Sequence, residues 1–200
     1  MTWRDRVLHD GVDREGWLAA RSTVITAHSA KGFARLESVE KYLLAKISAD
    51  RFTGNSYTEN GHLYEPMILA YLDVQPNTAL IHAPGNPGFA ATPDGLDTVL
   101  AEAKVRHGKI APNPDAGEWK QCAWQFMCVP EAEELRFGTL TLIQDGEGAW
   151  VPRAKDALTS LVIPRDHPKI TKAIDTIVPI AHEVLAALEV ALRAQKEMTF

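Results

Sequence analysis

A short apolar stretch, residues 99–105 (VLAEAKV), carries two opposite charges two positions apart, and it constrains the fold more than any other part of the chain. The apolar residues around Glu102 and Lys104 are typical of an interior strand, where unpaired charges are costly. Side chains at positions i and i+2 of a strand point to the same face. We therefore expect Glu102 and Lys104 to project together, with Ala103 buried behind them. Charges tolerated at such a place usually have a partner or a metal.

A second carboxylate, Asp94, lies in a tight turn eight residues before Glu102. If residues 89–92 and 99–105 pair as a twisted hairpin, Asp94 lies near the end of the charged face. Mg²⁺ takes one or two carboxylates and keeps several waters, so this face suits it, with the Ala103 carbonyl as a further ligand. Such a metal can activate a water and neutralise a phosphate, and the lysine can orient or deprotonate that water.

Each of these signals also has a plainer interpretation. A Glu and a Lys two apart on a strand often form a solvated pair that contributes little, and an Asp-Gly turn is common in any fold. The apolar neighbours of Glu102 and Lys104 favour the metal site. A third acid, Glu65, lies among apolar residues on a predicted helix. It either contributes to the site or faces water just before Pro66, and the sequence leaves both open.

Hydrophobic periodicity predicts helices around a block of short strands, which is an α/β fold with a central mixed sheet of four to five strands. We expect one domain over residues 1–200, with the last helix packing on the core. The predicted helices cover residues 14–50, 58–72, 118–129 and about 167–196. The predicted strands cover residues 79–83, 89–92, two pieces within 96–105, 135–143, 148–151 and 160–163.

Composition narrows the class of protein. The net charge of −5 counts against a passive DNA coat, but less against a nuclease, whose metal-binding acids add negative charge. The two cysteines fit a reducing cytoplasm, and neither a secretory signal nor a membrane span is expected. The seven histidines lack the paired spacing of zinc sites, and no glycine-rich phosphate loop predicts ATP use.

Five short motifs, in order along nearly the whole chain, resemble those of one family. Each motif alone is weak, but five with suitable spacing are fairly specific. They are Trp17-x-x-x-Arg21 with Val24-Ile25-Thr26-Ala27, Asn60-Gly61-His62-Leu63-Tyr64-Glu65-Pro66, Thr92-Pro93-Asp94-Gly95, Glu102-Ala103-Lys104, and Gln121-Cys122-Ala123-Trp124-Gln125. By these motifs the chain resembles the YqaJ-type viral recombinases, the bacteriophage lambda exonuclease-like family of the PD-(D/E)xK nuclease superfamily. The resemblance implies a restriction-endonuclease-like core and a long C-terminal helix.

The resemblance also implies a role for each matched acid and for the lysine. Glu65, Asp94 and Glu102, together with the Ala103 carbonyl, would hold one or two Mg²⁺ or Mn²⁺ ions. Lys104 would position the attacking water. These roles make the matched set the catalytic centre of a metal-dependent deoxyribonuclease.

Three further matched residues are implied to contact DNA. Arg21 would bind a phosphate, which in the family is the 5′-phosphate of the DNA end, and its forked guanidinium suits phosphate oxygens. Gln121 and Gln125 would line the site. The plainer interpretation is an ordinary helix-surface charge for Arg21 and a polar helix face for the two glutamines.

The chain departs from the family pattern at two places. His28 stands where the family has a serine, and Ser29 follows it. Ala123 stands where the family has a second glutamine. Both departures affect the DNA-end contacts, for which His28 and Ser29 are candidates, and neither affects the metal-binding acids.

The leading hypothesis is a 5′→3′ exonuclease on linear double-stranded DNA that leaves 3′ single-stranded tails for phage-type recombination. The resemblance implies a homotrimer, a single-strand annealing protein as partner, and the bacterial host cytoplasm as location if the chain is phage-encoded. One alternative is an endonuclease of the same superfamily in repair or restriction. Another is a non-catalytic DNA-binding or assembly protein with a decayed nuclease fold.

Overall fold

The structure is a computed structural model that describes residues 2–47 and 56–198. No helix in this described part is long and apolar enough to cross a membrane. In chain order the elements are η1 (Trp3–Arg6), β1 (Val7–His9), α1 (Arg14–Ser22), β2 (Ile25–Thr26), α2 (Ala27–Lys31), η2 (Leu36–Ser38), α3 (Val39–Ile47), α4 (Ser56–Leu72), β3 (Leu80–Ala83), β4 (Asn86–Ala91), β5 (Gly95–Leu96), β6 (Leu100–His107), α5 (Ala116–Cys128), β7 (Glu134–Gln144), β8 (Trp150–Pro152), β9 (Leu158–Pro164) and α6 (Pro168–Met198).

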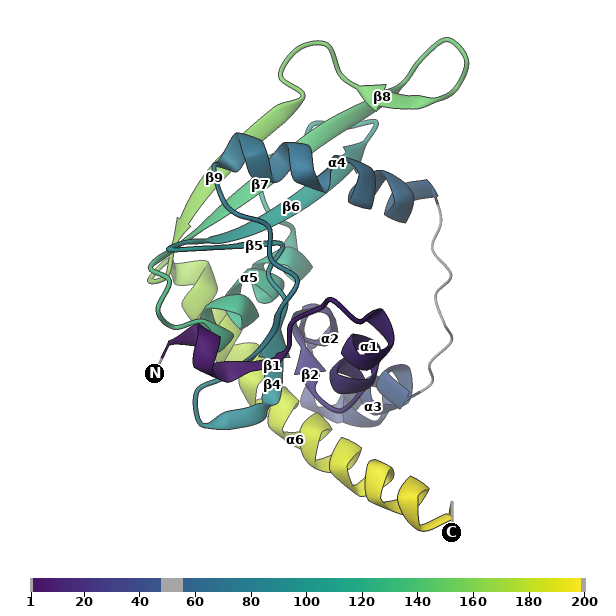
Figure 1. Ribbon diagram of the computed structural model, residues 1–200, viewed down its shortest axis with the longest axis vertical. Coiled ribbons are helices and arrows are strands. Elements are labelled where there is room, and N and C mark those ends of the chain that lie inside the picture. Colours follow the sequence, from purple (N-terminus) through teal and green to yellow (C-terminus); the bar gives the residue numbers. More distant parts are fainter. Residues whose placement is uncertain (1, 48–55, 199–200) are drawn as a thin grey trace.

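The strands form two mixed sheets (Figure 1). The four-stranded sheet has the order β1-β3-β4-β2, in which β2 and β4 are parallel. In the five-stranded sheet β6 lies between β5 and β7, and β7 pairs with both β8 and β9 on its other edge. Strands β6 and β7 are parallel, and α5 is the crossover that joins them. The α/β fold and the long C-terminal helix predicted from the sequence are therefore confirmed.

Helices cover both faces of the five-stranded sheet (Figure 1). Helix α4 packs on one face through Ile68, Leu69 and Leu72, against Leu140 and Leu142 of β7. The larger core lies on the other face, where α5 and α6 pack against the sheet. Its fully buried side chains include Leu100, Trp124, Phe126, Leu135, Phe137, Ile170 and Ile177. Strand β6 thus has a helix layer on each side, as its apolar residues predicted.

Two details of the sequence prediction are wrong. Residues 89–92 and 99–105 do not pair as a hairpin, because β4 already has β3 and β2 on its two edges. The antiparallel partner of β6 is β5, and the turn with Asp94 joins the two sheets instead. The helical stretch predicted over residues 14–50 is three helices interrupted by β2, and its residues 48–50 lie outside the described part.

Helix α4 approaches β7 so closely that only glycine fits at position 138. A Cβ atom added at Gly138 would lie 2.5 Å from Cγ2 of Ile68 and 2.9 Å from Cδ1 of Leu72. We expect Gly138→Ala to push α4 away from the sheet and to lower the free energy of unfolding by about 1–3 kcal/mol. Urea denaturation measures this change. Gly146→Ala is the control, because a Cβ atom there meets nothing within 4 Å, and an equal loss in both variants would contradict the prediction.

Candidate active site

The charged residues of β6 share one face, which is turned toward α5. Glu102 pairs with Lys104 on its own strand and with two glutamines of α5. Arg106, two positions further on, forms a two-pronged ion pair with the buried Glu118 of α5 at 2.7 Å for both bonds. Glu118 also accepts the backbone N–H of Asp115 and so closes the capping box of α5. This pair fixes α5 against β6.

Glu102 is a fully buried carboxylate whose two oxygens accept three hydrogen bonds. Its Oε1 accepts from Nζ of Lys104 and from Nε2 of Gln121, the latter at 2.5 Å. Its Oε2 accepts from Nε2 of Gln125. Gln125 itself is fully buried, so it positions Glu102 instead of lining an open site. A buried carboxylate needs such donors because it has lost its water.

The Asp94 side chain is held against the middle of β6. Its Oδ2 accepts the backbone N–H of Ala103 at 2.8 Å, which places the carboxylate beside the Glu102–Lys104 face. Asn77 fixes the turn, since it donates to the Pro93 carbonyl at 2.9 Å. Burial, followed by the charge of Glu102, raises the pKa of Asp94 well above its ordinary value.

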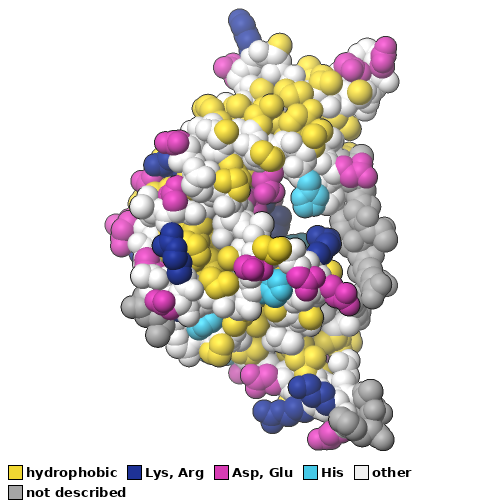
Figure 2. Space-filling model, viewed as in Figure 1, with side chains coloured by type: hydrophobic (Ala, Val, Ile, Leu, Met, Phe, Trp, Pro, Cys, Tyr) yellow, Lys and Arg dark blue, Asp and Glu magenta, His cyan; other side chains and the backbone are white. Residues whose placement is uncertain are grey.

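Glu65 approaches the same place from α4. A pocket of about 190 Å³ is bounded by Glu65 and His62 of α4, by Asp94, and by Ala103 and Lys104 of β6. Burial raises the pKa of Glu65, and the charge of Glu102 adds to the increase. Figure 2 shows acidic and basic side chains around a hollow between the region of α4 and the region of α1–α3. The three predicted acids thus converge, although they come from a helix, a turn and a strand.

Lys104 is the cation at the centre of these acids. Burial alone would lower the pKa of Lys104, but Glu102 and Asp94 together raise it above its ordinary value. The side chain is therefore an ammonium group at neutral pH. It donates to Glu102 and lines the pocket that also holds Glu65 and Asp94.

The acidic set suits a hard divalent cation. All of its side-chain donors are carboxylate oxygens, and burial, to which the charge of Glu102 adds, raises the pKa values of Asp94 and Glu65. Within residues 2–47 and 56–198, no three Asp, Glu, His or Cys side chains enclose a metal position as they lie.

An anion pocket of about 170 Å³ lies next to Asp94. Its lining includes Arg21 of α1, His28 of α2, Thr92, Asp94 and Gln121. The Arg21 guanidinium stacks over the Trp17 ring at 4.8 Å from the ring centroid and forms no salt bridge with a described residue. Burial lowers its pKa. The N–H donors of this guanidinium, which pair with no described acid, suit the oxygens of an anion.

Two residues of this region were not identified from the sequence. The Thr92 hydroxyl is buried without a partner in the described structure and lines the anion pocket, so a bound oxyanion would satisfy it. The Lys46 ammonium of α3 donates to the Arg21 carbonyl at 2.8 Å and lines an adjoining pocket of about 300 Å³. Thr92 lies inside the matched TPDG turn, which was a usable signal, whereas Lys46 is distant in sequence from every motif.

His28 and Ser29, the two DNA-contact candidates of α2, differ in the pockets that they line. His28 borders both the anion pocket and the adjoining pocket, and burial, followed by the positive charge of Arg21, lowers its pKa. Ser29 lines only the adjoining pocket, and its hydroxyl lies 3.4 Å from that of Thr26. The structure therefore brings Arg21, His28 and Gln121 together beside Asp94, and leaves Ser29 behind them.

No protein-family model and no curated protein sequence matches the chain. Solved structures do match. The alkaline exonuclease LHK-Exo from Laribacter hongkongensis is 24% identical with a TM-score of 0.64, and the match covers 92% of this chain and 99% of LHK-Exo. The structure of LHK-Exo in complex with dAMP gives a TM-score of 0.62 at 22% identity, with the same coverage. A phage-related exonuclease from Haemophilus somnus 129PT gives 0.59 at 12% identity, over 86% of this chain and 96% of that one.

The chain has the fold of these exonucleases. The match extends over nearly the whole length of each neighbour, so the likeness is one of the whole fold.

Proposed function

We propose that this protein is a Mg²⁺- or Mn²⁺-dependent exonuclease that degrades linear double-stranded DNA from its 5′ ends. One observation carries the proposal: the pocket lined by Glu65 and Lys104 and the anion pocket share Asp94 as a common wall. A scissile phosphate beside Asp94 would thus lie next to a second anion position lined by Arg21 and Thr92. The exonuclease-type fold supports the same function.

The chain's own residues would divide the reaction between them. Asp94, Glu102 and Glu65, with the Ala103 carbonyl, would hold one or two metal ions, which supply charge neutralisation and an activated water when bound. Lys104 would orient the attacking water through its ammonium donors. Gln121 and Gln125 would keep Glu102 in place. Mononucleotides and 3′ single-stranded tails would be the products, and a strand-annealing protein would use those tails.

Two substrates separate this function from the endonuclease alternative. We expect linear duplex DNA to be degraded in Mg²⁺ or Mn²⁺ but not in EDTA, and covalently closed circular DNA to survive. Cleavage of the closed circle would favour the endonuclease. A protein that binds DNA but degrades neither substrate with either metal would favour the decayed-fold alternative.

Arg21 should select the phosphorylated DNA end. Arg21→Ala is expected to raise KM for 5′-phosphorylated duplexes about 10- to 100-fold, the effect of losing a hydrogen bond to a charged group. It should change KM little for duplexes with a 5′-hydroxyl. Kinetics on the two duplexes measure this, with Arg14→Ala, on the same helix, as the control. Equal effects on both substrates would mean that Arg21 does not hold the terminal phosphate.

Lys46 should make end binding weaker at alkaline pH. Burial and the neighbouring Arg21 lower the pKa of Lys46 to about 8, so the side chain loses its charge as the pH rises through that value. We expect the Kd for a 5′-phosphorylated duplex to rise about tenfold between pH 7 and pH 9, through the loss of one charge-assisted contact. Fluorescence anisotropy in Ca²⁺ measures binding without Mg²⁺-supported cleavage. Lys46→Arg should remove most of the pH dependence, and an unchanged profile in that variant would exclude Lys46.

A further inference from the structure

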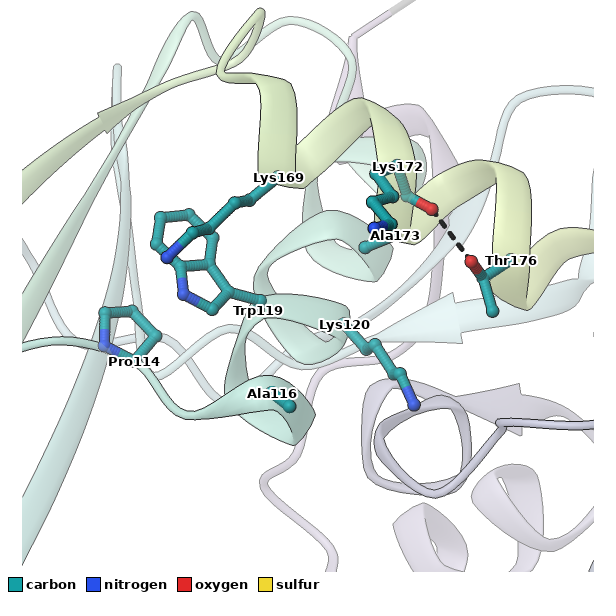
Figure 3. Close-up of a pocket in the computed structure, with 8 residues that line it drawn as sticks. All are labelled: Pro114, Ala116, Trp119, Lys120, Lys169, Lys172, Ala173 and Thr176. Carbon is teal, nitrogen blue, oxygen red and sulfur yellow. Dashed lines mark hydrogen bonds between the residues drawn. The ribbon is translucent and has the colours of Figure 1, made fainter.

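A pocket of about 370 Å³ lies outside the candidate active site, between the start of α5 and the first turns of α6 (Figure 3). Its apolar lining comes from Pro114, Ala116 and Trp119 on one side and from Ala173 on the other. None of these residues has a part in the proposed reaction. Ligand sites are typically concave and mostly apolar, with a few polar groups placed around the apolar lining.

Trp119 is the largest side chain in this pocket. It is 8% exposed, and its ring stacks on that of His167 with the centroids 4.8 Å apart. Its indole Nε1–H is buried and has no hydrogen-bond partner in the described structure. The Lys169 ammonium lies over the indole, 4.8 Å from the ring centroid (Figure 3). A buried indole N–H usually has a partner, so a ligand that moves the exposed Lys169 side chain aside would supply one.

Three lysines surround the apolar lining: Lys120, Lys169 and Lys172. None of them forms a salt bridge within the described residues. Lys120 is held in place because its ammonium donates to the Phe33 carbonyl at 2.6 Å. The chain has 26 acidic and 21 basic residues, so acids to pair with these lysines are not scarce. Ammonium groups that form no salt bridge with a described acid, gathered around an apolar hollow, complement a ligand that is both acidic and apolar.

We propose that this pocket binds an acidic peptide segment of a partner protein. One apolar side chain of the segment inserts between Trp119 and Ala173, while its carboxylates pair with the three lysines. The chemistry favours a peptide over DNA because no arginine is among the described residues that line the pocket and its wall is apolar, whereas the anion pocket beside Asp94 contains Arg21 and the Thr92 hydroxyl. The proposal is independent of the nuclease function.

The test uses the full chain and a fluorescein-labelled hexapeptide, Asp-Asp-Asp-Asp-Leu-Phe, in an anisotropy titration without DNA or metal. We expect saturable binding that weakens at least tenfold when the four aspartates become asparagines, or when Leu-Phe becomes Ser-Ser. Lys169→Glu with Lys172→Glu should weaken it at least tenfold. The matched control is Arg193→Glu with Lys196→Glu, which makes the same charge change on exposed positions of the same helix and should leave binding unchanged.

A second variant guards against loss of fold. Ala116→Glu adds an acid at an exposed position in the first turn of α5, where acids are tolerated, and it should repel the peptide. Unchanged thermal melting of each variant confirms folding. Binding that is insensitive to the Ser-Ser or asparagine changes would overturn the proposal. So would a charge-reversed pair that lowers affinity for duplex DNA without affecting the peptide, since the lysines would then belong to a DNA surface.

Discussion

Replacing Lys104 by alanine is expected to slow DNA cleavage about 10²- to 10⁴-fold, the usual contribution of a positioned proton-transfer or water-orienting group. The ammonium donates to Glu102 and lines the pocket with Asp94 and Glu65, so its loss removes the only lysine or arginine among the described residues that border that pocket. Single-turnover rates on a linear duplex in saturating Mg²⁺ measure the chemical step.

The control for this variant is Lys109→Ala, which removes an exposed lysine from the loop after β6 and should leave the rate unchanged. Lys104→Ala should still fold, because Gln121 and Gln125 continue to hold Glu102. A folded Lys104→Ala protein that cleaves at the original rate would mean that the reaction takes place elsewhere.

Replacing Asp94 by asparagine is expected to reduce cleavage to a similar extent while making the metal-free protein more stable. The asparagine oxygen can still accept the Ala103 N–H, but the side chain no longer brings a charge next to Glu102. Burial and Glu102 raise the pKa of Asp94 in the folded state, so ionising it costs folding stability as the pH rises above its unfolded value. That cost is present at neutral pH and is absent in the variant.

Thermal melts in EDTA and in Mg²⁺ separate the two effects. In EDTA, Asp94→Asn should melt at a higher temperature than the unmodified protein. Mg²⁺ at 100 times its Kd should stabilise the unmodified protein by about 2.7 kcal/mol and the variant much less. An Asp94→Asn protein that gains as much from Mg²⁺ as the unmodified chain would remove Asp94 from the proposed ligands. Asp145→Asn, at an exposed turn, is the matched control.

The core of the site could be predicted because its signals are local. Glu102 and Lys104 share a face by the two-residue period of a strand, and their apolar neighbours required a buried position. Asp94 could be placed near them because it lies only nine positions before Ala103, whose backbone N–H donates a hydrogen bond to it. The α5 helix could be predicted from its apolar spacing, and both of its glutamines contact Glu102.

What could not be predicted depends on contacts that are distant in sequence. Nothing local shows that β4 takes β2 as a parallel neighbour, so the hairpin with residues 99–105 was a reasonable but wrong pairing. The two residues of β2 are too few to interrupt a helical pattern by periodicity alone. Lys46 reaches the Arg21 carbonyl only because α3 folds back beside α1. The Arg106–Glu118 pair likewise forms only when α5 has packed against β6.

Helix α5 takes part in both places that this chain offers to ligands. Gln121 and Gln125 hold Glu102, whereas Trp119 and Lys120 of the same helix border the pocket beside α6. Any occupant of that pocket that rotates or shifts α5 also changes how Glu102 is held. Such coupling is reciprocal. If the occupant changes the affinity for the metal by some factor, the metal changes the affinity for the occupant by the same factor. Helix α5 would thus couple a partner bound beside α6 to a metal bound at Glu102, although the two lie in different pockets.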